Sequence, residues 1–281
     1  MAKPKIVLIT GCSSGIGAAP AQEFHQRGHQ VIATARRIDS LQGLAAQGLR
    51  TQTLDVNEAP SIASALASVQ GEFNRIDILI NNAGYGQFGA IMDAEPDDLR
   101  RQFETNVFAP VALSRAALAL LRNSGAGCIV NIGSISGLVT TPFAGVYCAS
   151  KAALHALSDA MRLELAPLGL HVVTVQPGGI ASGFGAAGEA QVRLPAGSLY
   201  APIARYVLGR AQASQRGATP AADFAREVAD HLLQANPPAV CRTGAQSTRL
   251  PLLKRWLPTR VLDRKLQKLF GLDRLGAAGP D

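Results

Sequence analysis

Two side chains, Tyr147 and Lys151, combine residue types and a spacing that suit acid–base chemistry. Side chains four residues apart on a helix lie on one face, one turn apart. A phenol titrates near pH ~10 and an amine near ~10.4, so neither alone is an effective acid or base at neutral pH. A lysine cation beside a tyrosine favours the phenolate and brings proton exchange closer to neutral pH. The pair therefore predicts a proton donor, although the same spacing is also common in surface pairs.

A third polar group, Ser134, stands thirteen residues before the tyrosine, just after the apolar run 128–132. That run predicts a buried parallel strand, and ligands of open α/β sheets collect outside the carboxyl ends of strands. A hydroxyl there can bind a substrate oxygen, although a lone serine at a strand end is usually part of a turn. Together, Ser134, Tyr147 and Lys151 resemble the Ser-Tyr-Lys triad of the classical short-chain dehydrogenase/reductase family.

A glycine-rich turn follows the first expected strand, residues 5–10, and leads into a helix that we expect to reach residue 27. Glycines let the backbone approach a pyrophosphate, and the start of the helix offers free N–H groups. The spacing T-G-x-x-x-G-x-G matches the short-chain family. We expect cofactor contacts from Gly11, Ser13, Ser14, Gly15, Ile16 and Gly17. Pro20 lies early in this helix and predicts a distorted first turn, or a local cost of ~3 kcal/mol.

The second expected strand, residues 30–35, runs into Arg36 and Arg37. Folds that bind NAD place an acidic side chain near this point, where it bonds the ribose 2′-hydroxyl. Two arginines can instead pair with the 2′-phosphate of NADP, although they also occur on solvated strand edges. We expect NADP(H) as the cofactor.

The family resemblance implies further site residues. The implied cofactor contacts are Asp55, Val56, Asn82, Ala83, Gly84, Pro177, Gly178, Ile180 and Ser182, together with Tyr147 and Lys151. Asn82 belongs to an Asn-Asn-Ala-Gly signature and can tie neighbouring strand ends together. Ser182 stands where the family usually has threonine, and it retains the hydroxyl that can bond the carboxamide. Asn106, in a helix expected from residue 96, matches the asparagine that bends this helix and holds a relay water.

The chain organisation predicts one domain over residues 1–281, with a dinucleotide-binding and catalytic core at 1–185 and a substrate lid with C-terminal helices at 186–275. We expect a flexible lid at 183–201 and helices at 202–214 and 220–234, the second capped by Thr219. The segment 250–271 alternates apolar and basic positions at helical spacing, and residues 277–281 have the composition of a disordered end.

The net charge of +7 is unevenly distributed. Residues 1–185 hold 13 basic and 13 acidic side chains, whereas residues 186–281 hold 14 and 7. Sparse aromatic residues and the lack of a recognisable motif argue against nucleic-acid binding. A basic rim that attracts NADP, a membrane-surface helix and an ordinary solvated face all remain open.

Four cysteines, Cys12, Cys128, Cys148 and Cys241, have no metal-ligand or CxxC spacing. They predict reduced thiols, no metal site and a cytoplasmic protein. No apolar run has the length of a membrane span or the form of a signal peptide.

The resemblance implies a Rossmann-like, doubly wound parallel sheet and hydride transfer between nicotinamide and a carbonyl or alcohol carbon. Ser134 would bind the substrate oxygen, Tyr147 would donate a proton, and Lys151 would lower the pKa of Tyr147 and bond the ribose. The longer tail resembles family members that act on steroids, retinoids and other lipophilic carbonyls, and the family implies a homodimer or homotetramer. The alternatives are an inactive NADP-binding regulator and a peripheral membrane module. An epimerase or dehydratase is less favoured, because its glycine spacing differs.

Overall fold

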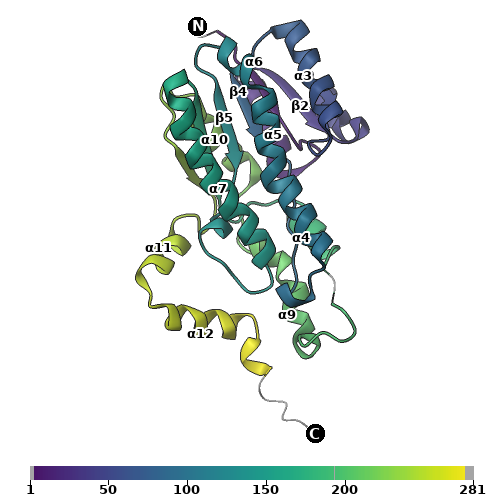
Figure 1. Cartoon of the computed structure of the whole chain (residues 1–281), viewed down its shortest axis with the longest axis vertical. Helices are drawn as coiled ribbons and strands as arrows, with labels where there is room; N and C mark the ends of the chain where they lie inside the picture. The colour runs from purple at the N-terminus through teal and green to yellow at the C-terminus, as the bar shows by residue number, and fades with distance from the viewer. Residues whose placement is uncertain (1–2, 193, 276–281) are drawn as a thin grey trace.

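Seven parallel strands form one sheet at the centre of the molecule (Figure 1). The computed structural model describes residues 3–192 and 194–275, and the strand order is β3-β2-β1-β4-β5-β6-β7. The strands are β1 (Ile6–Ile9), β2 (Gln30–Ala35), β3 (Arg50–Thr53), β4 (Ile78–Asn81), β5 (Cys128–Ile132), β6 (His171–Pro177) and β7 (Val240–Thr243). The order reverses between β1 and β4, and this reversal marks the ligand crevice of doubly wound folds.

The central strands are apolar because helices cover both faces of the sheet. Every residue of β1, β4 and β5 is buried. Val7 of β1 pairs with Val31 of β2 on one side and with Ile78 of β4 on the other. The predicted Rossmann-like fold is confirmed, with small shifts at the strand ends.

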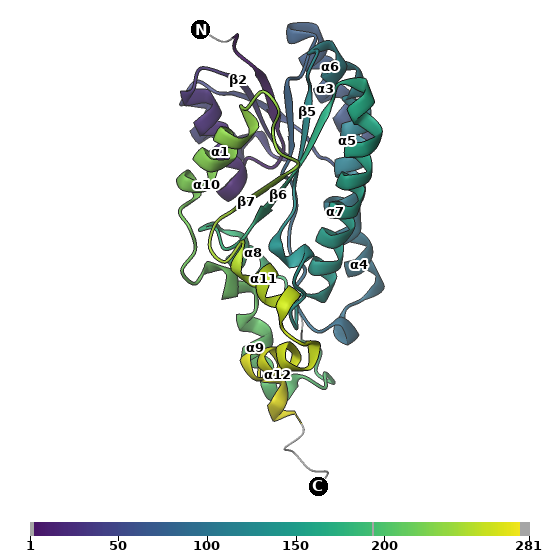
Figure 2. The same ribbon diagram turned by 90° about the vertical axis from the view of Figure 1, so that its left-hand side faces the viewer.

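Helices form the two outer layers (Figure 2). On one face lie α1 (Gly15–Gln26) and α10 (Ala221–Leu232); on the other lie α3 (Ala59–Phe73), α5 (Ala109–Ala116), α6 (Leu118–Asn123) and α7 (Gly145–Leu165). Phe24 of α1 and Phe224 of α10 are fully buried in the first layer. Leu66 of α3 and Leu113 of α5 are buried in the second.

A π-helical segment, Glu104–Phe108, joins α4 (Pro96–Phe103) to α5. Such segments widen the helix by one residue and are frequent at functional sites. Asn106 lies inside this segment and is buried. The predicted irregularity of this helix is therefore present.

Four helices that follow β6 build the lower end of the molecule (Figure 1). They are α8 (Phe184–Glu189), α9 (Ala204–Gly209), α11 (Arg249–Trp256) and α12 (Thr259–Leu269). A small apolar cluster that includes Phe143, Ile203, Val207 and Phe270 packs residues of α9 and α12 together.

In this region one expectation needs correction and two elements were not expected. The segment 183–201, whose role as a lid stays a prediction, contains helix α8, in which Gly185 and Gly188 pack closely against neighbouring residues. Thr219 is not the N-cap of α10: Pro220 holds that position, and the Thr219 N–H donates to the Gly179 carbonyl at 2.9 Å. Strand β7 was not expected. Residues 277–281 lie outside the described residues.

Helix α1 continues through Pro20, so the expected distortion is absent. Pro20 is buried on the same side of the helix as Ala21 and Phe24. Packing of this face against the sheet offsets the lost backbone hydrogen bond.

All four cysteines are buried and free. Within residues 3–192 and 194–275, no helix combines the length and hydropathy that crossing a membrane requires.

Candidate active site

A cavity of about 1070 Å³ lies at the carboxyl ends of the strands. Its volume is at the upper end of the range for ligand pockets. Nearly all residues predicted to form the site contribute to its wall: Gly11, Ser13, Ser14, Gly15, Ile16, Gly17, Arg36, Asp55, Val56, Asn82, Ala83, Gly84, Ser134, Tyr147, Lys151, Pro177, Gly178, Ile180 and Ser182. Arg37 and Asn106 lie outside the wall.

The start of α1 has the features of a phosphate cradle. Its N-cap, Ser14, makes no side-chain cap hydrogen bond, so the first N–H groups of the helix are left for a ligand. Gly11 and Gly15 have φ of +72° and +59°, a region that favours glycine. A Cβ on Gly17 would collide with the Gly11 carbonyl and the Asn82 amide. The glycines therefore fit a dinucleotide pyrophosphate.

Asn82 connects the exits of two neighbouring strands. Its Nδ2 donates to the carbonyls of Thr10 and Gly11 at 2.8 and 3.1 Å. The Thr10 hydroxyl accepts from the backbone N–H groups of Asn82 and Ala83 at 3.0 and 2.9 Å. These bonds hold the Ala83-Gly84 backbone at the cavity wall, in the role expected for Asn82.

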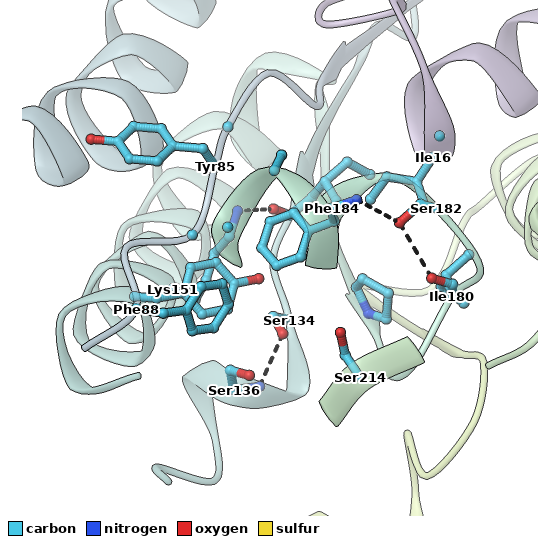
Figure 3. A pocket seen from close by; sticks show the side chains of 18 of the residues that line it. Ile16, Tyr85, Phe88, Ser134, Ser136, Lys151, Ile180, Ser182, Phe184 and Ser214 are labelled. Carbon is cyan, nitrogen blue, oxygen red and sulfur yellow. Dashed lines mark hydrogen bonds between the residues drawn. The ribbon is translucent and has the colours of Figure 1, made fainter. Parts of the chain in front are cut away.

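Ser134, Tyr147 and Lys151 come from the exit of β5 and the first turns of α7, and all three are buried. Figure 3 shows Ser134 and Lys151 at the pocket. The Ser134 hydroxyl accepts from the Ser136 N–H at 3.0 Å. Lys151 Nζ donates to the Ile132 carbonyl at 2.7 Å and lies 6.0 Å from the Tyr147 ring centroid. The structure thus brings the predicted hydroxyl, phenol and amine to one part of the wall.

Burial disfavours the charged form of each of these groups. It raises the pKa of Tyr147 to about 12, while the Ser134 hydroxyl and the Arg210 charge act in the opposite direction. It lowers the pKa of Lys151 to about 8. At neutral pH the phenol therefore carries its proton, the form that a proton donor needs. The expected effect of Lys151 on Tyr147 stays a prediction.

Asn106 contacts two neighbouring segments, and the relay water expected near it stays a prediction. Its Nδ2 donates to the Tyr85 carbonyl at 2.9 Å and to Ser150 Oγ at 3.2 Å, and its Oδ1 accepts from the Tyr85 N–H at 3.2 Å. The side chain therefore anchors the segment after β4 to the π-helical segment and to α7.

Two aromatic rings, which sequence reasoning did not single out, pack against the phenol. The ring centroids of Phe88 and Phe184 lie 6.0 and 5.5 Å from that of Tyr147. The two phenylalanine rings, labelled in Figure 3, are 6.0 Å apart. Phe184 follows Ser182, whose hydroxyl accepts from the Phe184 N–H at 3.4 Å. Only isolated phenylalanines mark this cluster in the sequence, because it forms from distant segments.

The far wall comes from the C-terminal helices. Its apolar lining includes Leu250, Leu253, Leu262, Leu266, Leu269 and Phe270, and a buried cation, Arg210, lies beside them. The leucines follow the apolar periodicity seen in residues 250–271, whereas Arg210 had no recognisable signal.

Comparison with known proteins agrees with this geometry. The family model for short chain dehydrogenase matches residues 5–192. Short-chain dehydrogenase cctT of Talaromyces islandicus is 36% identical over 285 residues, 98% of each chain. The NADPH-dependent 1-acyldihydroxyacetone phosphate reductase of Schizosaccharomyces pombe is 36% identical over 215 residues, 74% of this chain and 72% of that one. A short-chain dehydrogenase structure from Streptomyces avermitilis has a TM-score of 0.80 at 30% identity and 98% coverage of both chains.

The match extends over the glycine-rich cradle and over the segment that carries Ser134, Tyr147 and Lys151. The cradle fits the nicotinamide dinucleotide that this family uses. The chain belongs to the short-chain dehydrogenase/reductase family and is an oxidoreductase that acts on CH–OH or C=O groups with a nicotinamide cofactor.

Proposed function

We propose that the protein is an NADPH-dependent reductase of lipophilic ketones or aldehydes. The observation that carries the proposal is the burial of Ser134, Tyr147 and Lys151 together in the wall of the cavity that also contains the phosphate cradle. A hydroxyl, a protonated phenol and an amine in one water-poor site suit proton transfer to a carbonyl oxygen.

The nicotinamide, when bound, supplies the hydride that reaches the carbonyl carbon. The Ser134 hydroxyl holds the carbonyl oxygen, and the Tyr147 hydroxyl transfers its proton to that oxygen. Lys151 favours the resulting phenolate and bonds the ribose, so it serves both chemistry and cofactor binding. Asn106 contributes by fixing the segment after β4, and the relay water expected near it belongs to this proposal.

Arg36 favours NADP(H) over NAD(H), because it directly follows β2 and lines the cavity. A guanidinium fork suits a 2′-phosphate, whereas an acidic residue would suit a free hydroxyl. The NADPH dependence named for the S. pombe relative supports this choice.

A lipophilic substrate is favoured by the aromatic rings around Tyr147 and by the leucines of α11 and α12. These leucines line the cavity, whereas Leu252, Trp256 and Val261 of the same helices are exposed, so liposome co-sedimentation with and without residues 250–281 tests the membrane module. An inactive regulator is not favoured, since the three polar side chains are all retained. Exposed Phe108 and, on α7, Leu157 and Leu163 support the homodimer or homotetramer, which light scattering would measure.

Replacement of Tyr147 by phenylalanine tests the proposal. NADPH oxidation is first screened across ketosteroids, retinal, small aldehydes and acyl ketones, and the best substrate is then used. We expect Tyr147→Phe to lower kcat by ~10²–10⁴-fold, the usual contribution of a positioned acid, and to leave NADPH affinity nearly unchanged. Tyr200→Phe is the control, because Tyr200 packs on Phe143 outside the cavity wall. A Tyr147→Phe variant that keeps more than about a tenth of the rate would contradict the assigned role.

A further inference from the structure

A buried arginine stands in the substrate end of the cavity without an acidic partner. Arg210, which follows α9, is 8% exposed and contributes to the cavity wall. Its Nε and Nη2 both donate to one neutral acceptor, Thr141 Oγ1, at 3.1 and 2.7 Å. Within residues 3–192 and 194–275, no carboxylate forms an ion pair with it, and its Nη1 has no hydrogen-bond partner.

The guanidinium lies between two aromatic rings. Its central carbon is 5.4 Å from the ring centroid of Phe88 and 5.7 Å from that of Phe270. Cation–π contacts of this kind hold a guanidinium in a fixed orientation but compensate only part of the cost of burying a charge. A buried cation is normally paired with an anion, and the described chain provides none. An anionic group that enters the cavity would complete this site.

The position of Arg210 separates it from the phosphates of the cofactor. Its charge acts on the Tyr147 phenol beside the exit of β5, whereas Arg36 follows β2, three strands away in the sheet. The pyrophosphate has its own cradle at the start of α1, and Arg36 is available for a 2′-phosphate. An anion near Arg210 would consequently belong to the substrate.

The surroundings of Arg210 also define the rest of that substrate. Leu262, Leu266 and Leu269 of α12 continue the wall beyond Phe270 and offer an apolar surface. A molecule that reaches from Tyr147 past Arg210 thus meets a proton donor, a cation and an apolar wall.

We propose that Arg210 binds an anionic group, a carboxylate or a phosphate monoester, on an apolar-tailed carbonyl substrate. This assignment rests on the proposed function, since it names the substrate class of the same site. The rival explanation is that Arg210 only connects Thr141, Phe88 and Phe270 mechanically.

Binding of unreactive probes to the NADPH-saturated protein separates the two explanations. Decanoate, decyl phosphate and 1-decanol share an apolar chain and differ in the head group, and calorimetry gives each Kd. We expect Arg210→Gln to weaken both anions by ~10–100-fold, the range for a lost charged hydrogen bond, and to leave decanol unchanged. Arg205→Gln changes an exposed arginine of α9 and should alter the affinity of none of the three probes. The tighter of the two anions identifies the head group.

The Arg210→Lys variant distinguishes loss of charge from a general packing effect, because lysine keeps the positive charge but lacks the planar guanidinium group. It should retain part of the preference for anions over decanol. Equal losses for all three probes in both variants, or unchanged anion affinity in Arg210→Gln, would overturn the proposal in favour of a mechanical role.

A second readout uses turnover of a medium-chain oxo acid and its uncharged methyl ester. We expect Arg210→Gln to raise KM for the acid by ~10–100-fold, with kcat little changed and the ester unaffected. An equal loss for acid and ester would overturn the assignment. Tyr147→Phe should abolish both turnovers but keep the binding preference of the probes. If Tyr147→Phe retained the wild-type rate, the proposed function would fail. The affinities of the three probes would still test whether Arg210 binds an anionic group.

Discussion

Arg36 and Arg37 are adjacent in sequence but differ in their relation to the cavity. Arg36 contributes to the cavity wall. Arg37, which precedes the 3₁₀ turn Ile38–Leu41, lies outside the cavity wall. A guanidinium fork on a phosphate is among the stronger hydrogen-bonding arrangements in proteins. Of the two arginines expected to bind the 2′-phosphate, only Arg36 therefore lies in the cavity wall.

Cofactor affinities test this division. We expect Arg36→Ala to weaken NADPH binding by ~10–100-fold while NADH binding hardly changes, because NADH lacks the 2′-phosphate. Arg37→Ala should have a smaller effect and serves as the matched control. Kd values for both cofactors are measured at one ionic strength, since salt screens the interaction. Equal loss of both cofactors in the double variant, or a wild-type preference for NADH, would refute the NADP assignment.

His155 is a buried titratable residue behind Ser134. Its Nε2 accepts from the Ser134 N–H at 3.3 Å, an interaction that requires the neutral ring. Burial, followed by the charges of Lys151 and Arg242, lowers the pKa of His155 to about 4, and Asp159 opposes this shift only in part. An unfolded chain takes up a proton at a normal histidine pKa near ~6.5, whereas the folded protein does not until about pH 4.

Stability should therefore fall as the pH drops from ~6.5 toward 4, with His155 contributing about 2 kcal/mol of the loss by pH 5. We expect His155→Gln to be less stable than wild type at pH 7.5, and the gap to narrow at pH 5 by this amount. Urea unfolding at the two pH values measures it. The partly buried His231, replaced by glutamine, is the control. A gap that stays constant between the two pH values would exclude His155 as the source.

At the scale of elements, Asn106 in the π-helical segment Glu104–Phe108 connects the segment after β4 to helix α7. Asn106 satisfies both backbone polar groups of Tyr85 and reaches Ser150 of α7. The wider turn places this side chain between the segment after β4 and the helix that carries Tyr147 and Lys151. The sequence match to the family pointed to Asn106, but only the three-dimensional contacts reveal this connecting role.

Replacement of Asn106 by alanine should lower the free energy of unfolding by about 1–3 kcal/mol, because it leaves the half-buried Tyr85 N–H without its acceptor and removes the bond to Ser150 Oγ, while the Tyr85 carbonyl keeps its bond from Gln102 Nε2 at 2.9 Å. Asn57→Ala is the matched control: its amide donates to Thr105 of the same segment at an exposed position. That change should cost less than about 1 kcal/mol. Denaturant unfolding compares the two variants. Similar small losses in both would show that Asn106 does not hold the elements together.

At the scale of the whole molecule, the sequence predicted the half that binds the cofactor better than the half that faces the substrate. Strands β1, β4 and β5 are continuous apolar runs, and the motifs at their carboxyl ends have fixed spacing. Strand β7 was missed because it is a four-residue edge strand with alternating burial. Arg210 was missed because one arginine forms no pattern, and its burial depends on Phe88, Thr141 and Phe270 meeting in space.

The burial of the four cysteines determines how readily their thiols react with oxidants. Burial raises the pKa of Cys12 and Cys128 to about 12 and that of Cys241 to about 11, and it also raises the pKa of Cys148, the neighbour of Tyr147. The thiolate is the form that reacts with peroxides and alkylating reagents. At neutral pH the raised pKa values favour the thiol form of these groups in the folded protein, so we expect them to react slowly with such reagents. Thiol labelling would instead report the opening of the sheet around them.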